Sequence, residues 1–451
     1  MTTTMLQEPV APYRVDFEAY RETLREPDSL FTLRQSALER FEQDGFPTLR
    51  TEGWRFTDIA PIRDGVFRRS TAATAGDHAA VAADALAPFV FDDAIRLVFV
   101  DGFWAPGLSQ LEALPEGAYV GSLAQAIAEM PEQVLPHLGA HANHEGHPFV
   151  AMNTAFFGDG AFVSLPAHAV LEKPVHLLYV STDTADPEAT VSYPRNLLVG
   201  GENSQMTVVE TYAGLGPGRY FSCSATEVVA APHAVIDHYK VQHESHEAFH
   251  LATLQIYQQR ASNFFSHSVS TGGAITRNDV NAVLDDEGIE CTLNGLYLAK
   301  GTQLVDNHMR MDHAKPNCNS YELYKGILDG RSRAVFNGLI YVHQDAQKTD
   351  AKQSNRNLLL SEGAIANSQP QLEIFADDVR CTHGSTVGQL DEEAVFYLRS
   401  RGIGEEAANS LLTYAFASDI VSRIKVEPVR RDLEEFLFTR LPRGEVVRQA
   451  V

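Results

Sequence analysis

The stretch from about Phe162 to Cys381 carries short strand-like segments and no helical period. Apolar and β-branched residues come in short runs such as QMTVVETYAG and CSATEVVAAPHAVIDHYKV. Glycines between the runs are interpreted as turn positions: Gly272, Gly273, Gly288, Gly295, Gly301, Gly330, Gly338 and Gly363. Many short strands separated by turn residues are typical of a sandwich, a barrel or a β-solenoid. The stretch is long for one sandwich and its spacing is not a strict repeat, so spacing alone leaves the solenoid open.

Helical patterns lie on both sides of this β-rich stretch. FEAYRETLREPDSLFTLRQSALERF (17–41) has apolar residues at helical spacing, interrupted by Pro27. SLAQAIAEM predicts a helix with Ser122 as its N-cap, and IRLVFVDG (95–102) predicts a strand. DEEAVFYLRSRG, EEAANSLLTYAFASDIVSRI and RRDLEEFLFTRL predict helices near the C-terminus. We therefore expect a mostly helical region over 1–150, a β core over 151–400 and a helical domain over 401–451.

Composition excludes several classes of partner. The 451 residues carry a formal charge of −23, which argues against nucleic acid and anionic membranes as main partners. No apolar run approaches the ~20 residues of a membrane span. The N-terminal residues show no export signal, and the four cysteines form neither a CxxC pair nor a disulfide framework. We expect a cytoplasmic protein.

One cysteine and one histidine are candidates for chemistry near the end of the β-rich stretch. Cys381 and His383 are two residues apart, and positions i and i+2 of a strand point to the same face. Thiolate and imidazole both ligate iron, and a neighbouring imidazole favours the thiolate. Two ligands do not complete a metal site, so a second chain or remote residues would have to supply the others. The alternative is a packed or surface pair without chemistry.

A second candidate is the strand-like segment QLVDNHMRMDH. Alternation predicts one apolar face with Val305, Met309 and Met311, and one polar face with Asp306, His308, Arg310 and Asp312. His308, Asp312 and His313 resemble a metal set, but the two histidines are five residues apart and fall on opposite faces. We interpret the segment as a polar strand face rather than a metal site. No phosphate-binding loop, GxSxG or HExxH motif occurs, so no ATP site or hydrolase site is predicted.

A helical stripe near the C-terminus is a candidate docking surface. It comprises Leu411, Leu412, Ala415, Phe416 and Ile420, and the tail after Val421 is slightly basic on an acidic protein. The pattern predicts either partner docking or an ordinary solvated helix pair.

Several segments resemble one known family. Residues Val335 to Ile403, which include KTDAKQSNRNLLLS, LEIFADDV and FYLRSRGI, resemble the signature stretch of the SufB/SufD proteins of iron–sulfur cluster assembly. EGWRFTDI and MNTAFFGDGAFVSLPAHAVLEKPV resemble further segments of that family. The chain is similar to the SufD branch, because its first cysteine is Cys223 and its local sequence is CTHGSTVG.

The resemblance implies a fold and a function. The fold is a right-handed parallel β-helix between an N-terminal helical region and a C-terminal helical domain. The function is a non-catalytic scaffold that forms a heterodimer with a SufB-like subunit, while a SufC-like ATPase, which binds the ATP, docks on the C-terminal helices. Sulfur donor proteins would act indirectly.

The resemblance also implies site residues. His383 takes the position linked to cluster formation at the SufB interface, with a transient cluster shared with SufB. Cys381 is either a ligand or a structural thiol. Flavin is associated with the whole complex, and no residue of this chain is predicted to hold it. The alternative function is a stand-alone β-helix enzyme for carbohydrate or acyl substrates that uses the Asp306, His308, Arg310 and Asp312 face.

Overall fold

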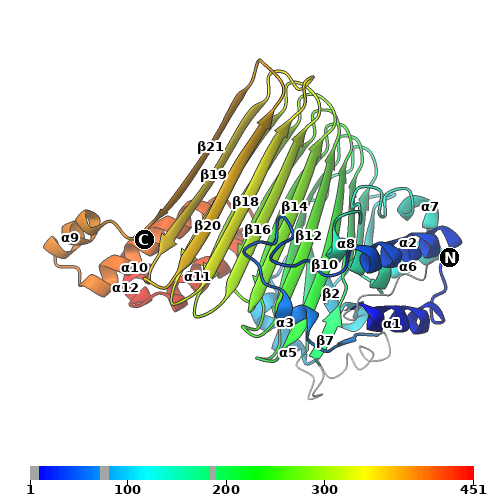
Figure 1. Cartoon of the computed structure of the whole chain (residues 1–451), viewed down its shortest axis with the longest axis horizontal. Helices are drawn as coiled ribbons and strands as arrows, with labels where there is room; N and C mark the ends of the chain where they lie inside the picture. The colour runs from blue at the N-terminus through cyan, green and yellow to red at the C-terminus, as the bar shows by residue number, and fades with distance from the viewer. Residues whose placement is uncertain (1–9, 72–80, 183–188, 451) are drawn as a thin grey trace.

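A flattened solenoid runs through the molecule, with helices at both ends of the chain packed against it (Figure 1). The structure is a computed structural model and describes residues 10–71, 81–182 and 189–450. Strand accounts for 39% of the described residues and helix for 25%, and the solenoid makes about seven turns. The prediction of a mainly β fold with a β-solenoid core is confirmed.

Two sheets face each other across the solenoid, and each turn gives one strand to each sheet. In the described residues the first sheet has the order β20-β18-β16-β14-β12-β10-β8-β5-β4, with β1 and β7 beside it. The second has the order β21-β19-β17-β15-β13-β11-β9-β6-β2-β3. Apart from the antiparallel pairs β4–β5 and β2–β3, the strands pair in parallel.

The strands of the first sheet are β1 (Phe67–Arg69), β4 (Tyr119–Ser122), β5 (Ala161–Leu165), β7 (Ala189–Ser192), β8 (Arg195–Gly200), β10 (Tyr220–Ala230), β12 (Phe249–Gln258), β14 (Ile275–Leu284), β16 (Leu304–His313), β18 (Arg333–Val342) and β20 (Ile365–Ile374). Those of the second are β2 (Ile95–Val100), β3 (Phe103–Trp104), β6 (Val175–Ser181), β9 (Gln205–Gly214), β11 (Val235–His243), β13 (Asn263–Ser270), β15 (Glu290–Ala299), β17 (Asn319–Leu328), β19 (Asp350–Leu359) and β21 (Arg380–Gly388).

A left-handed residue recurs at one corner of successive turns. It lies two residues before a strand of the second sheet, and the positions are Asn203, His233, Ala261, Gly288, Asn317 and Lys348. At the five non-glycine positions the backbone N–H donates to a carbonyl of the next turn, for example from Lys348 to Asp378 at 2.6 Å. A positive φ costs free energy in an L-residue, so the repeated corner contacts must offset that cost.

Two glycines that we predicted as turns lie inside strands instead. A Cβ at Gly295 in β15 would stand 2.2 Å from the ring of Tyr324, and one at Gly338 in β18 would stand 2.3 Å from Gln353 Nε2. These glycines make room for large side chains that fill the interior between the sheets. The turn interpretation is wrong for both, because a glycine that admits a large side chain into the core, from the next strand for Gly295 and from the opposite sheet for Gly338, gives the same sequence signal as a turn glycine.

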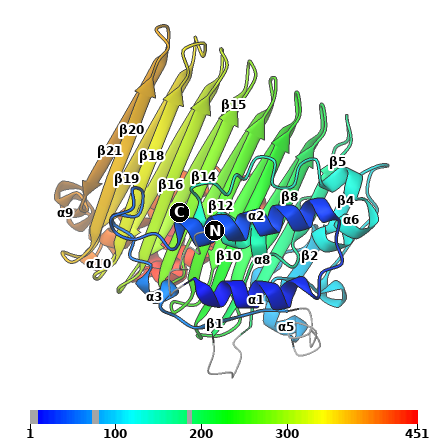
Figure 2. The same cartoon turned by 45° about the vertical axis from the view of Figure 1, so that its right-hand side comes forward.

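The N-terminal helices cover one part of the first sheet (Figure 2). The helical segment is interrupted between α1 (Ala11–Arg21) and α2 (Asp28–Asp44), as predicted from Pro27, which is the N-cap residue of α2. The buried helix α8 (Pro148–Phe156) lies between α2 and the solenoid. Ser122 caps α6 (Leu123–Glu129), since its Oγ accepts the N–H of Gln125 at 3.1 Å. The shorter helices are α3 (Ala60–Arg63), α5 (Ala83–Leu86), η2 (Ala87–Phe89), η3 (Pro106–Leu108) and α7 (Pro131–Val134).

The C-terminal helices are α9 (Glu392–Ser400), α10 (Glu405–Val421), α11 (Glu427–Arg440) and α12 (Gly444–Ala450). Helices α10 and α11 pack on the outer face of the second sheet. The apolar cluster buried between them includes Tyr239 and Leu296 of the sheet and Ile420 of α10. Lys325 on β17 fastens α10 through an ion pair with Asp419 at 2.7 Å. Helix α9 projects away from the solenoid, and none of its residues is buried. Within the described ranges, no helix is long and apolar enough to cross a membrane.

Candidate functional site

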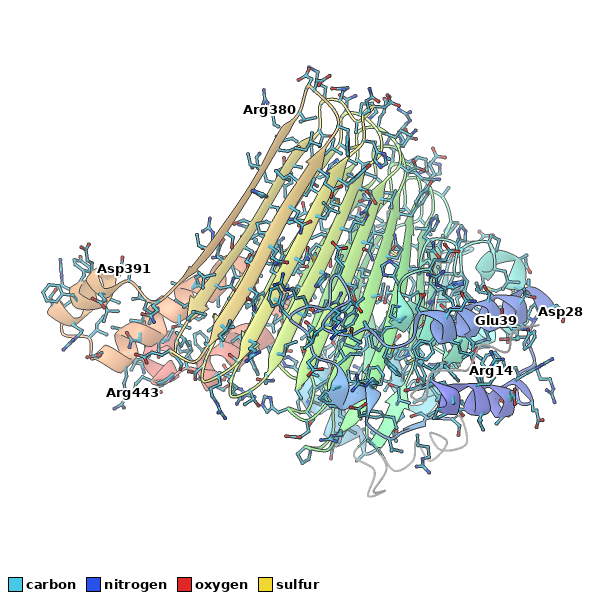
Figure 3. All side chains as sticks on the ribbon, viewed as in Figure 1. Arg14, Asp28, Glu39, Arg380, Asp391 and Arg443 are labelled. Carbon is cyan, nitrogen blue, oxygen red and sulfur yellow. The ribbon has the colours of Figure 1, made fainter. Side chains whose placement is uncertain are left out.

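The last turn of the solenoid, made by β20 and β21, ends both sheets. In the part of the chain that the structure describes, β20 pairs with β18 alone and β21 with β19 alone, so one edge of each strand is unpaired. Figure 3 shows Arg380 at one end of β21 and Asp391 beyond its other end, where α9 begins. We call the exposed side of this turn, residues 365–388, the open end. Unpaired strand edges favour pairing with another chain.

Apolar side chains are exposed at and beside the open end. Phe375 is 56% exposed and Val387 is 47% exposed, and Ile365 and Ile374 are also exposed. On the neighbouring helix α9, Phe396 is 73% exposed. Ile365 and Ile374 are the first and last residues of β20, so the exposed apolar side chains are spread along the strand, and such side chains favour association with another molecule only where they are contiguous.

Cys381 and His383 lie on β21 within this turn. In the parallel register Cys381 stands beside Ala351, and His383 stands beside Gln353. Ala351 and Gln353 are buried, so they point into the interior, and Cys381 and His383 point the same way with no further turn above them. Cys381 is half-buried against the core, and burial raises the pKa of its thiol. The side chain of His383 is exposed.

Few side chains at the open end could act as metal ligands. Among the described residues, no three His, Cys, Asp or Glu side chains are grouped so that they could hold a metal ion. Cys381 and His383 offer sulfur and nitrogen, which are the donor types that iron accepts. Two donors do not complete a metal site by themselves.

The second candidate face has the alternation that the sequence predicts. Val305, Met309 and Met311 point into the core, and Asp306 lies on the outer side beneath the N-terminal loop. Asp306 accepts hydrogen bonds from Thr57 Oγ1 at 2.5 Å and from Arg277 Nη1 at 2.7 Å. Burial alone would raise the pKa of Asp306, but Arg277 and His308 outweigh burial and lower it.

Arg277, which sequence reasoning missed, organises this face. Its guanidinium stacks on Trp54 at 3.7 Å, donates to the carbonyl of Gly53 at 2.7 Å and pairs with Asp279 and Asp306. Arg277 therefore holds the loop of the EGWRFTDI segment against the solenoid. A cavity of about 240 Å³ lies beside this contact. Only a contact across the fold could have revealed Arg277, because it lies far in sequence from the loop.

The other candidate residues of β16 lie on both sides of the sheet. Arg310 and Asp312 form an exposed ion pair at 2.8 Å. His308 lies 3.1 Å from Asp306 on the outer side, whereas His313 is buried inside, 2.8 Å from Ser320. Burial lowers the pKa of His313 to about 4, so it is neutral. The two histidines lie on opposite sides of the sheet, so they do not face a common site.

The predicted docking stripe on α10 is divided between two environments. Ile420 is fully buried against the solenoid, and Phe416 is half-buried beneath the ammonium of Lys325 at 4.7 Å. Leu411 and Leu412 are half-buried, so part of each side chain stays accessible. The exposed aromatic residues of α9 were not part of the predicted surface, although FYLRSRGI carries two adjacent aromatic residues in its sequence.

Comparisons with known proteins agree with this architecture. The family model "SUF system FeS cluster assembly, SufBD core domain" matches residues 181–416, and the "SufBD protein N-terminal region" matches 11–177. The chain is 31% identical to iron–sulfur cluster assembly protein SufD of Escherichia coli, over 91% of this chain and 93% of that protein. It is 32% identical to a SufBD family protein of Synechocystis, over 92% of each chain, and 25% identical to SufD of Bacillus subtilis.

The chain therefore belongs to the SufB/SufD family of iron–sulfur cluster assembly proteins. Its nearly full-length similarity to the SufD of Escherichia coli confirms the predicted SufD branch. A role in iron–sulfur cluster assembly follows from this membership.

Proposed function

We propose that this chain is a scaffold subunit that builds iron–sulfur clusters at its open end together with a second, SufB-like solenoid. One observation carries the proposal. Within the described part of the chain, the last turn leaves one long edge of β20 and one of β21 unpaired, exposes apolar side chains and presents Cys381 and His383 on the uncovered side. A partner with a similar parallel edge would continue the sheets and bury this surface.

The open end supplies ligands but no self-contained catalytic site. His383 acts as an iron ligand or transfers a proton beside a sulfur-bearing cysteine of the partner, and the nascent cluster is cargo that both subunits share. Cys381 contributes either a second sulfur or a packed thiol. ATP is bound and hydrolysed by a SufC-like subunit in the cytoplasm, not by this chain.

The test of the site replaces His383 in the whole complex. We expect His383→Ala, co-expressed with the partner subunits, to assemble with normal stoichiometry and ATPase activity but to accumulate little iron and sulfide. The matched control is His343→Ala, another exposed histidine on the solenoid. Cys381→Ser should match the defect of His383→Ala if the thiol is a ligand and should be milder if it only packs. Normal cluster content with His383→Ala would overturn the assignment and leave only the scaffold role.

We further propose that the ATPase subunit docks on α9 and the accessible part of α10. Ile420, which is buried, and Phe416, which is half-buried, would support docking by holding α10 on the solenoid. Leu411, Leu412 and the exposed face of α9 would make the contact. The substitution Leu412→Asp, combined with Phe396→Asp, should abolish ATPase capture in a pull-down. Val15→Asp on α1, where the side chain is 69% exposed, is the control that should leave capture unchanged. Equal capture by all variants would refute this docking surface.

A further inference from the structure

A column of polar side chains leads from the interior to His383. Glu322 on β17, Gln353 on β19 and His383 on β21 are successive partners in the parallel register of the second sheet. Glu322 and Gln353 are 3% and 2% exposed. Adjacent strands are about 4.8 Å apart, so side chains on neighbouring strands of this column can contact one another directly.

Glu322, on the preceding turn, fixes the orientation of the Gln353 amide. Its Nε2 donates to Glu322 Oε2 at 2.7 Å, which directs the NH₂ group toward the carboxyl. Its Oε1 is buried and, within the described residues, accepts no hydrogen bond. Gly338 on the opposite sheet leaves space for this amide, since a Cβ there would stand 2.3 Å from Nε2.

We propose that Gln353 is a positioning residue for His383, with its Oε1 accepting the N–H of one ring nitrogen. The other ring nitrogen then keeps its lone pair for a metal ion or a proton at the open end. Histidines that bind metals commonly donate their second ring nitrogen to a carbonyl or carboxylate oxygen in this way. Glu322 acts one step further away, because its carboxyl holds the orientation of the Gln353 amide. This inference rests on the role proposed for His383.

Glu322 holds the Gln353 amide in a buried environment that favours the neutral carboxylic acid. Burial raises its pKa to about 7, and the hydrogen bond from Gln353 only partly opposes that effect. Among the described residues, Cys291 on β15 and Tyr324 on β17 interact with this carboxyl, and burial keeps both protonated by raising their pKa values. A hydrogen-bonded anchor rather than an ion pair therefore sets the position of Gln353.

The experiment measures the ring tautomer of His383 and needs no cluster. The chain is labelled with ¹⁵N-histidine, and long-range ¹H–¹⁵N spectra report which ring nitrogen carries the proton. The variant His383→Gln identifies the signal by its loss. In the unsubstituted chain we expect one tautomer to dominate, and Gln353→Leu should replace it with the mixture found for free imidazole. Glu322→Leu should cause the same loss, while Glu322→Gln, which still offers an acceptor, should retain the single tautomer.

Asn355→Leu is the matched control. Asn355 is a buried inward amide on the same strand that donates to Tyr297 Oη at 3.0 Å, but its partner in the register is Ser385. It should leave the His383 signal unchanged. A His383 tautomer that is insensitive to Gln353→Leu, or equally sensitive to Asn355→Leu, would overturn the inference. Neither result depends on cluster formation, so the proposed function stands or falls separately through His383→Ala.

Discussion

The variant Glu322→Gln should stabilise the protein at alkaline pH and leave it nearly unchanged in mild acid. Glu322 is buried, and burial raises its pKa from 4.5 to about 7. Between these pH values the folded state keeps a proton that the unfolded state has lost, so stability falls as pH rises through this window. The shift of about 2.5 pKa units corresponds to about 3 kcal/mol at 1.36 kcal/mol per unit. A glutamine of the same shape does not incur this cost.

Urea unfolding of both proteins at a series of pH values from about 4 to about 8.5 measures the effect. The free energy of unfolding of the variant minus that of the unsubstituted chain should grow from near zero at about pH 4 to about 3 kcal/mol at about pH 8.5. A difference that does not change with pH would refute the reasoning, because it would mean that Glu322 ionises inside the fold as easily as outside it.

Glu227→Gln is the control with the opposite sign. Glu227 is also buried, but it pairs with Arg195 at 2.6 Å and accepts the N–H of Gly139 and of Ala142. Burial alone would raise its pKa, yet these partners outweigh burial and lower it. This substitution should destabilise the protein by about 3–5 kcal/mol near neutral pH, since it leaves Arg195 uncompensated. The loss should shrink as pH falls through the depressed pKa of Glu227.

Three further outcomes follow from the packing. Gly338→Ala should cost about 1–3 kcal/mol in urea unfolding, because its Cβ would meet Gln353, and an unchanged midpoint would contradict the close approach. Asp306→Asn weakens the pairing with Arg277 and should speed tryptic cleavage in the N-terminal loop without shifting cleavage elsewhere. Cys381 should react slowly with iodoacetamide at neutral pH and faster as pH rises, because burial raises its pKa; fast labelling at pH 7, seen by mass spectrometry, would disprove this.

The local elements of the fold were predictable from short-range patterns. The break at Pro27 and the cap at Ser122 depend on backbone chemistry that a few neighbouring residues determine. The alternation of apolar and polar residues along 304–313 predicted which side of the strand faces the core, because successive side chains of a strand point to opposite faces. The choice of a solenoid among β folds needed the family resemblance, because the turns differ in length and leave no strict repeat in the sequence.

The remaining features depend on contacts between turns. Asn317 and Lys348 adopt left-handed conformations that their residue types do not demand, because the corner hydrogen bonds offset the strain. Gly338 faces Gln353 across the interior, and Gln353 lies beside His383 only because successive turns keep their register. Residue spacing could identify Cys381 and His383 as a pair, but it could not indicate the side chains beneath them.

The two ends of the solenoid differ in a way that limits growth. At the N-terminal end the sheets finish in β4 and β3, which have four and two residues and run antiparallel to their neighbours, whereas β20 and β21 have ten and nine. A subunit with two matching long edges could add copies without limit and form a filament, as other open strand edges do. Under the proposed function, the long end pairs with one partner, and the short antiparallel strands at the other end offer no matching edge for a second. The N-terminal end would therefore terminate the assembly that the long end begins, which protects a strand-rich protein against fibre formation.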